Sequence, residues 1–145
     1  ARFYIDIRGL KMGNKNYFKV FQGRKGTKQP FYLLVRKYNN KYWVRGAARQ
    51  DSGKYKLTKW HNLPLKPVAV EMEWKAAPGN ANHNGYLKLW VNGKLKQKIG
   101  KLNNDQMKIF NVRVGITQSI NNSFNIYGAF FLDAFVSNDK YYIGN

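Results

Sequence analysis

The chain of 145 residues contains 26 lysine and arginine residues against 7 aspartate and glutamate residues, which gives a formal net charge of +19. Its hydrophobic content of 43% excludes a disordered chain and suffices for the core of one domain, which we expect to span residues 1–145. The absence of cysteine excludes disulfide bonds and thiolate metal sites, and no apolar run approaches the roughly 18 residues that a membrane-spanning helix needs.

Short segments of strand-like composition alternate with turn signals along the whole chain. The aromatic content of 16%, dominated by tyrosine and phenylalanine, favours strands. Many short strands with regular turns are typical of a β-sandwich or barrel, so we predict an all-β fold with at most one helical turn, near residues 104–108. The predicted strands are 2–7, 17–22, 31–38, 41–49, 54–60, 68–75, 86–91, 94–99, 109–116 and 127–136. The predicted turns include 8–9, 12–14, 23–26, 39–40, 51–53, 78–80, 92–93, 103–105 and 121–122.

Several of these segments separate into an apolar and a more polar face at the two-residue period of a strand. We expect the apolar set of each segment to face the core. The sets are Tyr42, Val44, Gly46 and Ala48; Val68, Val70, Met72 and Trp74; and Phe110, Val112, Val114 and Ile116.

The segment around Asn92–Gly93 allows two hairpin registers. A two-residue loop pairs Val91 with Lys94 and mixes lysines with core residues. A three-residue loop, with the glycine in the left-handed conformation, pairs Leu89 with Leu95 and keeps the lysines outside. We predict the second register because it gives the more consistent core. Its inner residues are Leu87, Leu89, Leu95, Gln97 and Ile99, and its outer residues are Tyr86, Lys88, Trp90, Lys94, Lys96 and Lys98.

The positive charge is distributed among the predicted strands rather than collected in a tail. In segment 94–99 lysines alternate with other residues at the strand period, so that they share one face. A tail of like charges would indicate a disordered arm, whereas charge within strands gives a folded, rigid, positive surface. Such a surface favours a polyanionic partner.

Several strand motifs resemble those of one family. They are PheLysValPheGlnGly (18–23), TyrTrpValArgGlyAlaAlaArg (42–49), AlaValGluMetGluTrpLys (69–75), GlyTyrLeuLysLeuTrpValAsnGlyLysLeu (85–95), ValArgValGlyIle (112–116), PhePheLeuAspAlaPheValSer (130–137) and TyrTyrIleGly (141–144). In this order the motifs resemble concanavalin A-like lectin/glucanase domains, and most closely the laminin-G-like jelly-roll modules of large bacterial surface or secreted proteins.

The resemblance implies a two-sheet antiparallel jelly-roll β-sandwich, a location outside the cell or at its surface, and often carbohydrate binding. It implies no particular ligand, because this fold serves lectins, hydrolases, lyases and plain spacers. We expect the chain to be a fragment of a longer protein.

The hydrolases of this superfamily place three acids on one strand in the pattern Glu-x-Asp-x-x-Glu, because two carboxylates must flank the scissile bond. The only close acidic pair here is Glu71 and Glu73, and Ala76 occupies the third position. We therefore expect these carboxylates to form cross-strand ion pairs rather than a catalytic pair.

Jelly-roll polysaccharide lyases combine an arginine or glutamine, which neutralises a uronate, with histidine or tyrosine as base and acid. The histidines of this chain, His61 and His83, stand in segments where we expect solvated side chains. The Gln-Ile/Val-His motif of alginate-lyase-like enzymes is absent. We predict that the chain is not an enzyme and has no catalytic residues.

No cluster of acids suggests a metal site. Structural calcium is common in lectin-like jelly rolls and requires several oxygen ligands from one or two loops. Asp51, Asp105, Asp133 and Asp139 are single acids in separate segments. Asp133 matches an acid that the resembling modules usually have, and we expect it to be a hydrogen-bond acceptor first and a calcium ligand second. We predict no cofactor, with structural calcium left open.

An aromatic and basic strand face is the candidate binding site. Sugar rings stack on tryptophan and tyrosine, while arginine binds carboxylate or sulfate groups in two-pronged fashion. Segment 41–49 offers both residue types on its outer face, and the neighbouring strands extend them. The predicted ligand-binding residues are Tyr32, Arg36, Trp43, Arg45, Arg49 and Trp60, with Tyr55 as an alternative to Trp60. The opposing interpretation is that the tryptophans pack under loops and the arginines form a solvated face.

The sequence thus favours a non-catalytic recognition module that binds an acidic polysaccharide or another polyanion. The alternative is a structural or protein-interaction domain of a larger extracellular assembly, docked on other domains of the parent chain or on an acidic partner. Nucleic acid would be attracted by the same lysines without sequence specificity, because no helix is predicted to enter a major groove. Single-stranded bases that stack on tyrosine and tryptophan are a weaker alternative, as is a polysaccharide lyase. We expect no insertion into membranes.

Overall fold

Extended segments dominate the computed structural model, which describes residues 1–79, 83–119, 126–140 and 143. Strands take up 64% of the described residues and this part of the chain contains no helix, which confirms the predicted all-β class. Near residues 104–108 the chain forms a turn, closed by a hydrogen bond from the Met107 amide to the Asn104 carbonyl oxygen (3.1 Å). Within the described ranges, nothing has the helical length and apolarity of a membrane span.

The strands are β1 (Arg2–Asp6), β2 (Leu10–Met12), β3 (Tyr17–Lys25), β4 (Lys28–Tyr38), β5 (Lys41–Arg49), β6 (Tyr55–Leu57), β7 (His61–Leu63), β8 (Val68–Lys75), β9 (Gly85–Val91), β10 (Lys94–Leu102), β11 (Asn111–Ser119), β12 (Ile126–Gly128) and β13 (Phe131–Val136).

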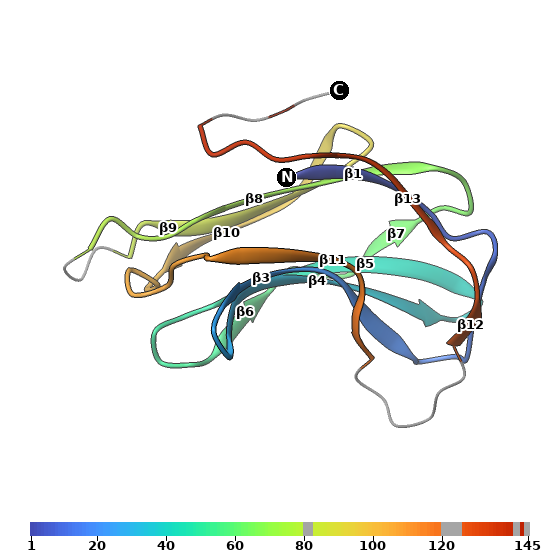
Figure 1. The fold of residues 1–145 in the computed structure, drawn as a ribbon, viewed down its shortest axis with the longest axis horizontal. Coiled ribbons are helices and arrows are strands. Elements are labelled where there is room, and N and C mark those ends of the chain that lie inside the picture. The colour runs from blue at the N-terminus through green and yellow to red at the C-terminus, as the bar shows by residue number, and fades with distance from the viewer. Residues whose placement is uncertain (80–82, 120–125, 141–142, 144–145) are drawn as a thin grey trace.

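These strands form two layers that lie one above the other in Figure 1. One layer is a five-stranded sheet with the order β10-β9-β8-β1-β13. The other is a six-stranded sheet with the order β11-β3-β4-β5-β6, in which β7 also pairs with β5, so that β6 and β7 follow one another along one edge. A small sheet of β2 and β12 lies at one end of the layers (Figure 1). The neighbouring strands are antiparallel, and the arrangement is that of a β-sandwich.

The predicted alternation of β5 and β8 is confirmed. In β5, Tyr42, Val44 and Ala48 are buried between the layers, while the residues between them face outward or lie beneath neighbouring side chains. In β8, Val68 and Met72 are buried in the same core. The two-residue period of these strands therefore sets which face of each sheet meets the other.

Aromatic side chains connect the two layers. The rings of Phe3 and Phe21 lie 5.7 Å apart, and Phe31 is 5.5 Å from Phe21 and 5.7 Å from Trp74 (centroid distances). Strands β1 and β8 of one sheet are thereby packed against β3 and β4 of the other. Fully burying each such ring contributes about 1.5–3 kcal/mol, so this row of rings is a main contact between the sheets.

The predicted register at the start of the β9–β10 hairpin is wrong. Lys94 pairs with Val91, which leaves a two-residue turn with positive φ at Asn92 (49°) and Gly93 (68°). These angles are those of a type I′ turn, which matches the twist of a hairpin and is favoured by the sequence Asn-Gly. The preference of the turn therefore overrides the hydrophobic pattern. As a result, Leu95 is 53% exposed instead of buried, and Lys94 lies on the side of the core residue Val91.

A β-bulge then restores the predicted inner face. The extra residue is Lys96, after which Gln97 pairs with Leu89 and Ile99 pairs with Leu87. Ile99 is buried as predicted. The hairpin thus keeps both the favoured turn and most of the predicted core contacts, but the first residues of β10 lose the predicted burial pattern.

The predicted burial of the apolar residues of segment 109–116 is also wrong. β11 is the last strand of its sheet and faces β13, the last strand of the other sheet, and no further described strand covers the pair. Val112 lines a small cavity with Phe135 of β13 rather than a closed core. The exposed fractions are 70% for Phe110, 43% for Val112, 39% for Val114 and 50% for Ile116.

Several element boundaries differ from the prediction. The predicted strand 127–136 is divided into β12 and β13, and Gly128, the last residue of β12, adopts a φ of 87° where the chain leaves the small sheet. Segment 54–60 is reduced to β6, and the three-residue strands β2 and β7 were not predicted because they are too short to show a period. The predicted turns at residue 80 and at 121–122, and Tyr141–Tyr142 of the family motif, lie outside the described residues.

Candidate functional site

The predicted binding residues gather on the outer face of the six-stranded sheet. Arg36 of β4 lies opposite Trp43 of β5 and Tyr17 of β3, so the antiparallel register aligns these side chains across the sheet. Each of the six predicted residues is half-buried. We call this surface the basic–aromatic face. It comprises Tyr17, Lys19, Tyr32, Arg36, Trp43, Arg45, Arg49, Tyr55 and Trp60.

The indole ring of Trp60 is the centre of one half of this face. The guanidinium carbon of Arg36 lies 4.1 Å from the ring centroid of Trp60, and that of Arg45 lies 4.4 Å from it. Arg36 is also 5.0 Å from the ring of Tyr38. Attraction to the ring electrons offsets part of the repulsion between the two cations and fixes their positions. The ring of Trp60 is thus occupied by contacts with two arginines of the same chain.

Tyr32 and Tyr55 form the other half of the face. Their ring centroids are 5.0 Å apart, and the Tyr55 hydroxyl donates to the Gln29 carbonyl oxygen at 2.9 Å. The ammonium group of Lys19 lies 4.6 Å from the Tyr32 ring, and the guanidinium carbon of Arg49 lies 5.7 Å from the Tyr55 ring. Cations therefore flank the aromatic rings along the outer face from Arg36 to Arg49.

The arginines of this face are partly desolvated and incompletely paired. The Nε atoms of Arg36, Arg45 and Arg49 are buried, and none has a hydrogen-bond partner among the described residues. Burial lowers the pKa of Arg36, and it lowers the pKa of Arg45, where the nearby Tyr32 opposes the shift and Arg36 adds to it. A buried donor without a partner costs about 1–3 kcal/mol, so an anion that accepted from these groups would recover part of that cost.

Carboxylates are absent from the strands that form this sheet. Strands β3, β4, β5, β6, β7 and β11 contain no aspartate or glutamate, although lysine and arginine occur in most of them. The seven acids of the chain are Asp6, Glu71, Glu73 and Asp133 in the five-stranded sheet, and Asp51, Asp105 and Asp139 in connecting segments. No internal counterion from a strand of this sheet therefore competes for the arginines.

Trp43 is placed differently from Trp60. It lies across from Arg36 in the sheet, and its indole nitrogen donates to the Tyr38 carbonyl oxygen at 3.2 Å. Trp43 makes no ring stacking or cation contact of the kind that holds Trp60 in the described part of the chain. Of the two predicted tryptophans, Trp43 is therefore the one whose ring has no cation or ring partner among the described residues.

The acidic pair of β8 has structural partners. Glu73 forms a salt bridge of 2.9 Å with Lys88, the residue directly opposite it on β9, and it also accepts a hydrogen bond from the Tyr86 hydroxyl. Glu71 is buried and accepts from the amide of Ile143 at 3.0 Å. The predicted cross-strand ion pair is confirmed for Glu73.

The other singled-out acids form no metal cluster in the described part of the chain, where no group of three candidate ligands comes together. Asp133 accepts a hydrogen bond from the amide of Ala134 at 2.7 Å, in agreement with its predicted role as an acceptor. Asp51 and Asp105, far apart in the sequence, approach each other, and burial together with Asp105 raises the pKa of Asp51.

Sequence reasoning missed two members of the face, Tyr17 and Lys19. Both stand at outward positions of β3, as the register with Arg36 and Leu34 shows. The two-residue period of segment 17–22 was the available signal for them. The chain matches no protein-family model and no curated protein.

Proposed function

We propose that this chain is a non-catalytic recognition module that binds an acidic polysaccharide through the basic–aromatic face. The observation that supports this proposal is the set of half-buried arginines with unpartnered Nε atoms on a sheet whose strands have no acids. Carboxylate or sulfate groups of the polysaccharide would accept hydrogen bonds from Arg36, Arg45 and Arg49. A sugar ring would stack on Trp43.

The contacts of Trp60 support recognition of an ordered anion array rather than diffuse attraction. Arg36 and Arg45 are held against its ring, so little side-chain entropy remains to be lost when an anion binds. Lysines on flexible stems lack this advantage. The proposal also includes a jelly-roll topology of the concanavalin A-like type, which the crossovers that place β1 between β8 and β13 support. It further includes a location outside the cell.

Binding to sulfated and uronate-rich polysaccharides tests the proposal. We expect Arg45→Gln and Arg36→Gln each to weaken binding of the best polysaccharide by about 1–3 kcal/mol, the scale of a lost charge-assisted hydrogen bond, or about 5- to 150-fold in Kd. Lys98→Gln removes the same charge from an exposed position of the other sheet and should cost less than about 1 kcal/mol. Isothermal titration calorimetry at two salt concentrations measures both effects.

Equal losses in the arginine variants and in Lys98→Gln would contradict a defined site and leave only general attraction by charge. Single-stranded DNA is the control for nucleic acid, and its affinity should fall steeply with salt because counterion release dominates it. Binding of DNA that was stronger than that of every polysaccharide, at both salt concentrations, would overturn the carbohydrate proposal. New reducing ends or unsaturated ends after incubation would contradict the absence of catalysis.

A structural role is the second candidate, and the exposed apolar side chains of β11 and β13 favour it. Ile116 is 50% exposed and Phe131 66% exposed at the ends of the two sheets. Exposed apolar surface of this kind is typical of interaction sites. The partner in this second proposal is another domain of the parent chain. In that case the amides of β11 should exchange hydrogen more slowly in the longer parent protein than in residues 1–145 alone. Unchanged exchange would reject this docking.

A further inference from the structure

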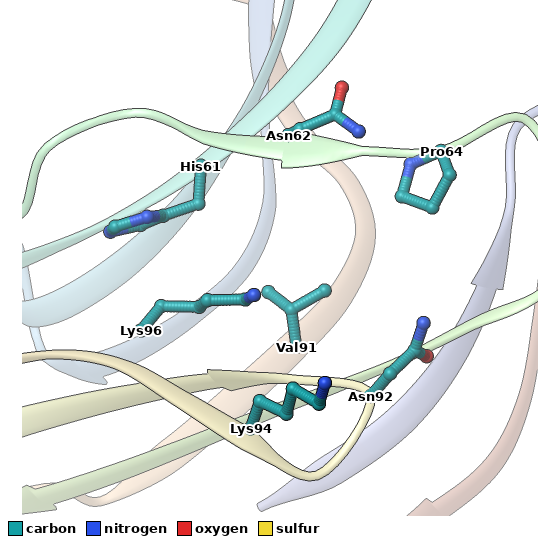
Figure 2. A pocket seen from close by; sticks show the side chains of 7 residues that line it. All are labelled: His61, Asn62, Pro64, Val91, Asn92, Lys94 and Lys96. Carbon is teal, nitrogen blue, oxygen red and sulfur yellow. The ribbon is translucent and has the colours of Figure 1, made fainter.

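A separate cavity lies at the opposite edge of the sandwich from β11. It has a volume of about 370 Å³ and lies between β7 of the six-stranded sheet and the β9–β10 hairpin of the other sheet (Figure 2). Ligand pockets begin at about 300 Å³, so this cavity has room for a molecule of monosaccharide size. It is not part of the basic–aromatic face, because the side chain of His61 points inward, between the two sheets, toward the hairpin.

The charged groups around this cavity are cations, and its uncharged polar groups are His61 and the side-chain amides of Asn62 and Asn92. Figure 2 shows Lys96 extending between His61 and Val91, with Lys94 and Asn92 on the hairpin below and Pro64 opposite. No ion pair involves Lys94 or Lys96 within the described ranges. No carboxylate lines the cavity. A cavity of this composition attracts an anion.

Asn92 and His61 add donors whose orientation is set by the fold. The side-chain oxygen of Asn92 accepts from the Ala69 amide at 3.0 Å, which leaves its NH₂ group as the free end. The Nε2 atom of His61 is buried and lacks a hydrogen-bond partner among the described residues. Val91 and Pro64 supply apolar surface beside these polar groups, as a sugar ring requires.

The register of the hairpin is the reason that lysines face this cavity. The type I′ turn at Asn92 and Gly93 places Lys94 on the side of Val91, and the bulge at Lys96 adds a second lysine before the core pattern resumes at Gln97. Functional sites are the places where charged residues are expected to interrupt an otherwise apolar core pattern. β-Bulges commonly redirect side chains at such sites.

We propose that this cavity is a second binding site, which takes the carboxylate-bearing ring of a single acidic sugar. Lys94 and Lys96 bind the carboxylate, the NH₂ group of Asn92 and the imidazole of His61 bind ring hydroxyls or the same anion, and Val91 with Pro64 contacts the apolar face of the ring. The site goes beyond the basic–aromatic face, and neither requires the other.

The environment of His61 adds a pH dependence to this site. Burial lowers the pKa of His61, Lys96 and Lys59 lower it further, and a hydrogen bond with Gln97 opposes them. Lys94 is the remaining charged group that lines the cavity. A bound carboxylate favours the protonated imidazole and so opposes this lowering of the pKa. Binding therefore takes up a proton and tightens as the pH falls toward and below the ordinary histidine pKa of about 6.5.

Titration of the isotope-labelled chain with glucuronate, followed by amide chemical shifts in nuclear magnetic resonance, tests the proposal. We expect saturable shifts at Asn92–Lys96 and His61, with tighter binding at pH 5.5 than at pH 7.5, and no saturation with glucose. Lys94→Gln combined with Lys96→Gln should weaken binding at least about tenfold, the scale of about 1.4 kcal/mol. Lys98→Gln, on the same strand and exposed, is the matched control and should bind as the wild type does.

Each other outcome overturns a stated part of the proposal. Inorganic sulfate that bound as tightly as glucuronate would show an anion site without sugar recognition. Equal binding of glucose would exclude the role of the lysines, as would unchanged binding in the double variant. Shifts confined to Trp60 and Arg45 would place the sugar on the basic–aromatic face instead and would leave that face supported while this site fails. Retention of the pH difference in His61→Gln would remove His61 from the site.

Discussion

Replacing Gly93 by valine tests the turn on which the β9–β10 hairpin depends. Asn92 and Gly93 have φ angles of 49° and 68°, a region in which the branched side chain of valine collides with its own backbone. Such strain at a residue other than glycine costs about 1–3 kcal/mol, so we expect Gly93→Val to lower the free energy of unfolding by about 2 kcal/mol.

The turn has little freedom to avoid this cost. The amide of Asn92 donates to the Ala69 carbonyl oxygen at 2.8 Å, and its side chain accepts from the Ala69 amide. Rearrangement of the turn would therefore release β8 as well. Thermal unfolding followed by circular dichroism measures the effect, because a loss of about 2 kcal/mol lowers the Tm of a chain of this size by about 4–8 °C.

Gly100→Ala is the matched control in the same hairpin. The nearest atom to an added Cβ at Gly100 is the Lys98 Cε at 4.0 Å, and its φ lies outside the left-handed range. Alanine there should leave the Tm unchanged or raise it slightly, because it restricts the unfolded chain. An unchanged Tm in Gly93→Val, or an equal loss in both variants, would refute the assignment of the strain to the turn.

Two further predictions concern the side chain of Asn104 and the hydroxyl of Tyr86. Asn104→Ala should lower the free energy of unfolding by about 1–3 kcal/mol, because it leaves the buried Ala77 amide without the side-chain oxygen that accepts from it at 2.8 Å. A Cβ at Gly85 would lie 1.9 Å from the same oxygen, so chemical denaturation should show a smaller loss for Gly85→Ala in the Asn104→Ala background, whereas additive losses would show that the two residues act independently. Burial and the hydrogen bond to Glu73 raise the pKa of Tyr86 to about 12. The contribution of this raised pKa to the free energy of unfolding is complete below the unfolded tyrosine pKa of about 10 and is lost as the pH rises toward 12. We therefore expect the stability difference between wild type and Tyr86→Phe to disappear by pH 12. A difference that persisted at pH 12 would contradict this prediction.

The parts of the fold that were predictable are those in which one residue pattern determines the outcome. In β5 both arginines stand at alternate positions and the opposite set has no charge, so the sequence places Tyr42 and Val44 inside and Arg45 outside without knowledge of the other strands. The same argument places Arg36 and Trp43 on one outer face. Most of the basic–aromatic face follows from it.

The remaining features depend on contacts that the pattern does not contain. At Asn92–Gly93 the backbone preference of the turn competes with the hydrophobic pattern, and the bulge at Lys96 satisfies both, which no fixed register predicts. The alternation of β11 identifies an apolar side but not whether another strand covers it, hence the exposure of Val114. The contact of Trp60 with two arginines requires the segment between β6 and β7 to fold back over the sheet.

The unequal distribution of acids between the two sheets has a consequence for the approach of a ligand. Because the six-stranded sheet has no negative charge in its strands, the field of the protein is most positive in front of that sheet and weaker in front of the five-stranded sheet, where Glu73 and Asp133 lie. This field would orient the molecule toward a polyanion before contact, over a range set by a Debye length of about 8 Å at physiological ionic strength. In the proposed complex, salt would therefore slow association, whereas the lifetime of the complex would depend on the short-range contacts of the arginines.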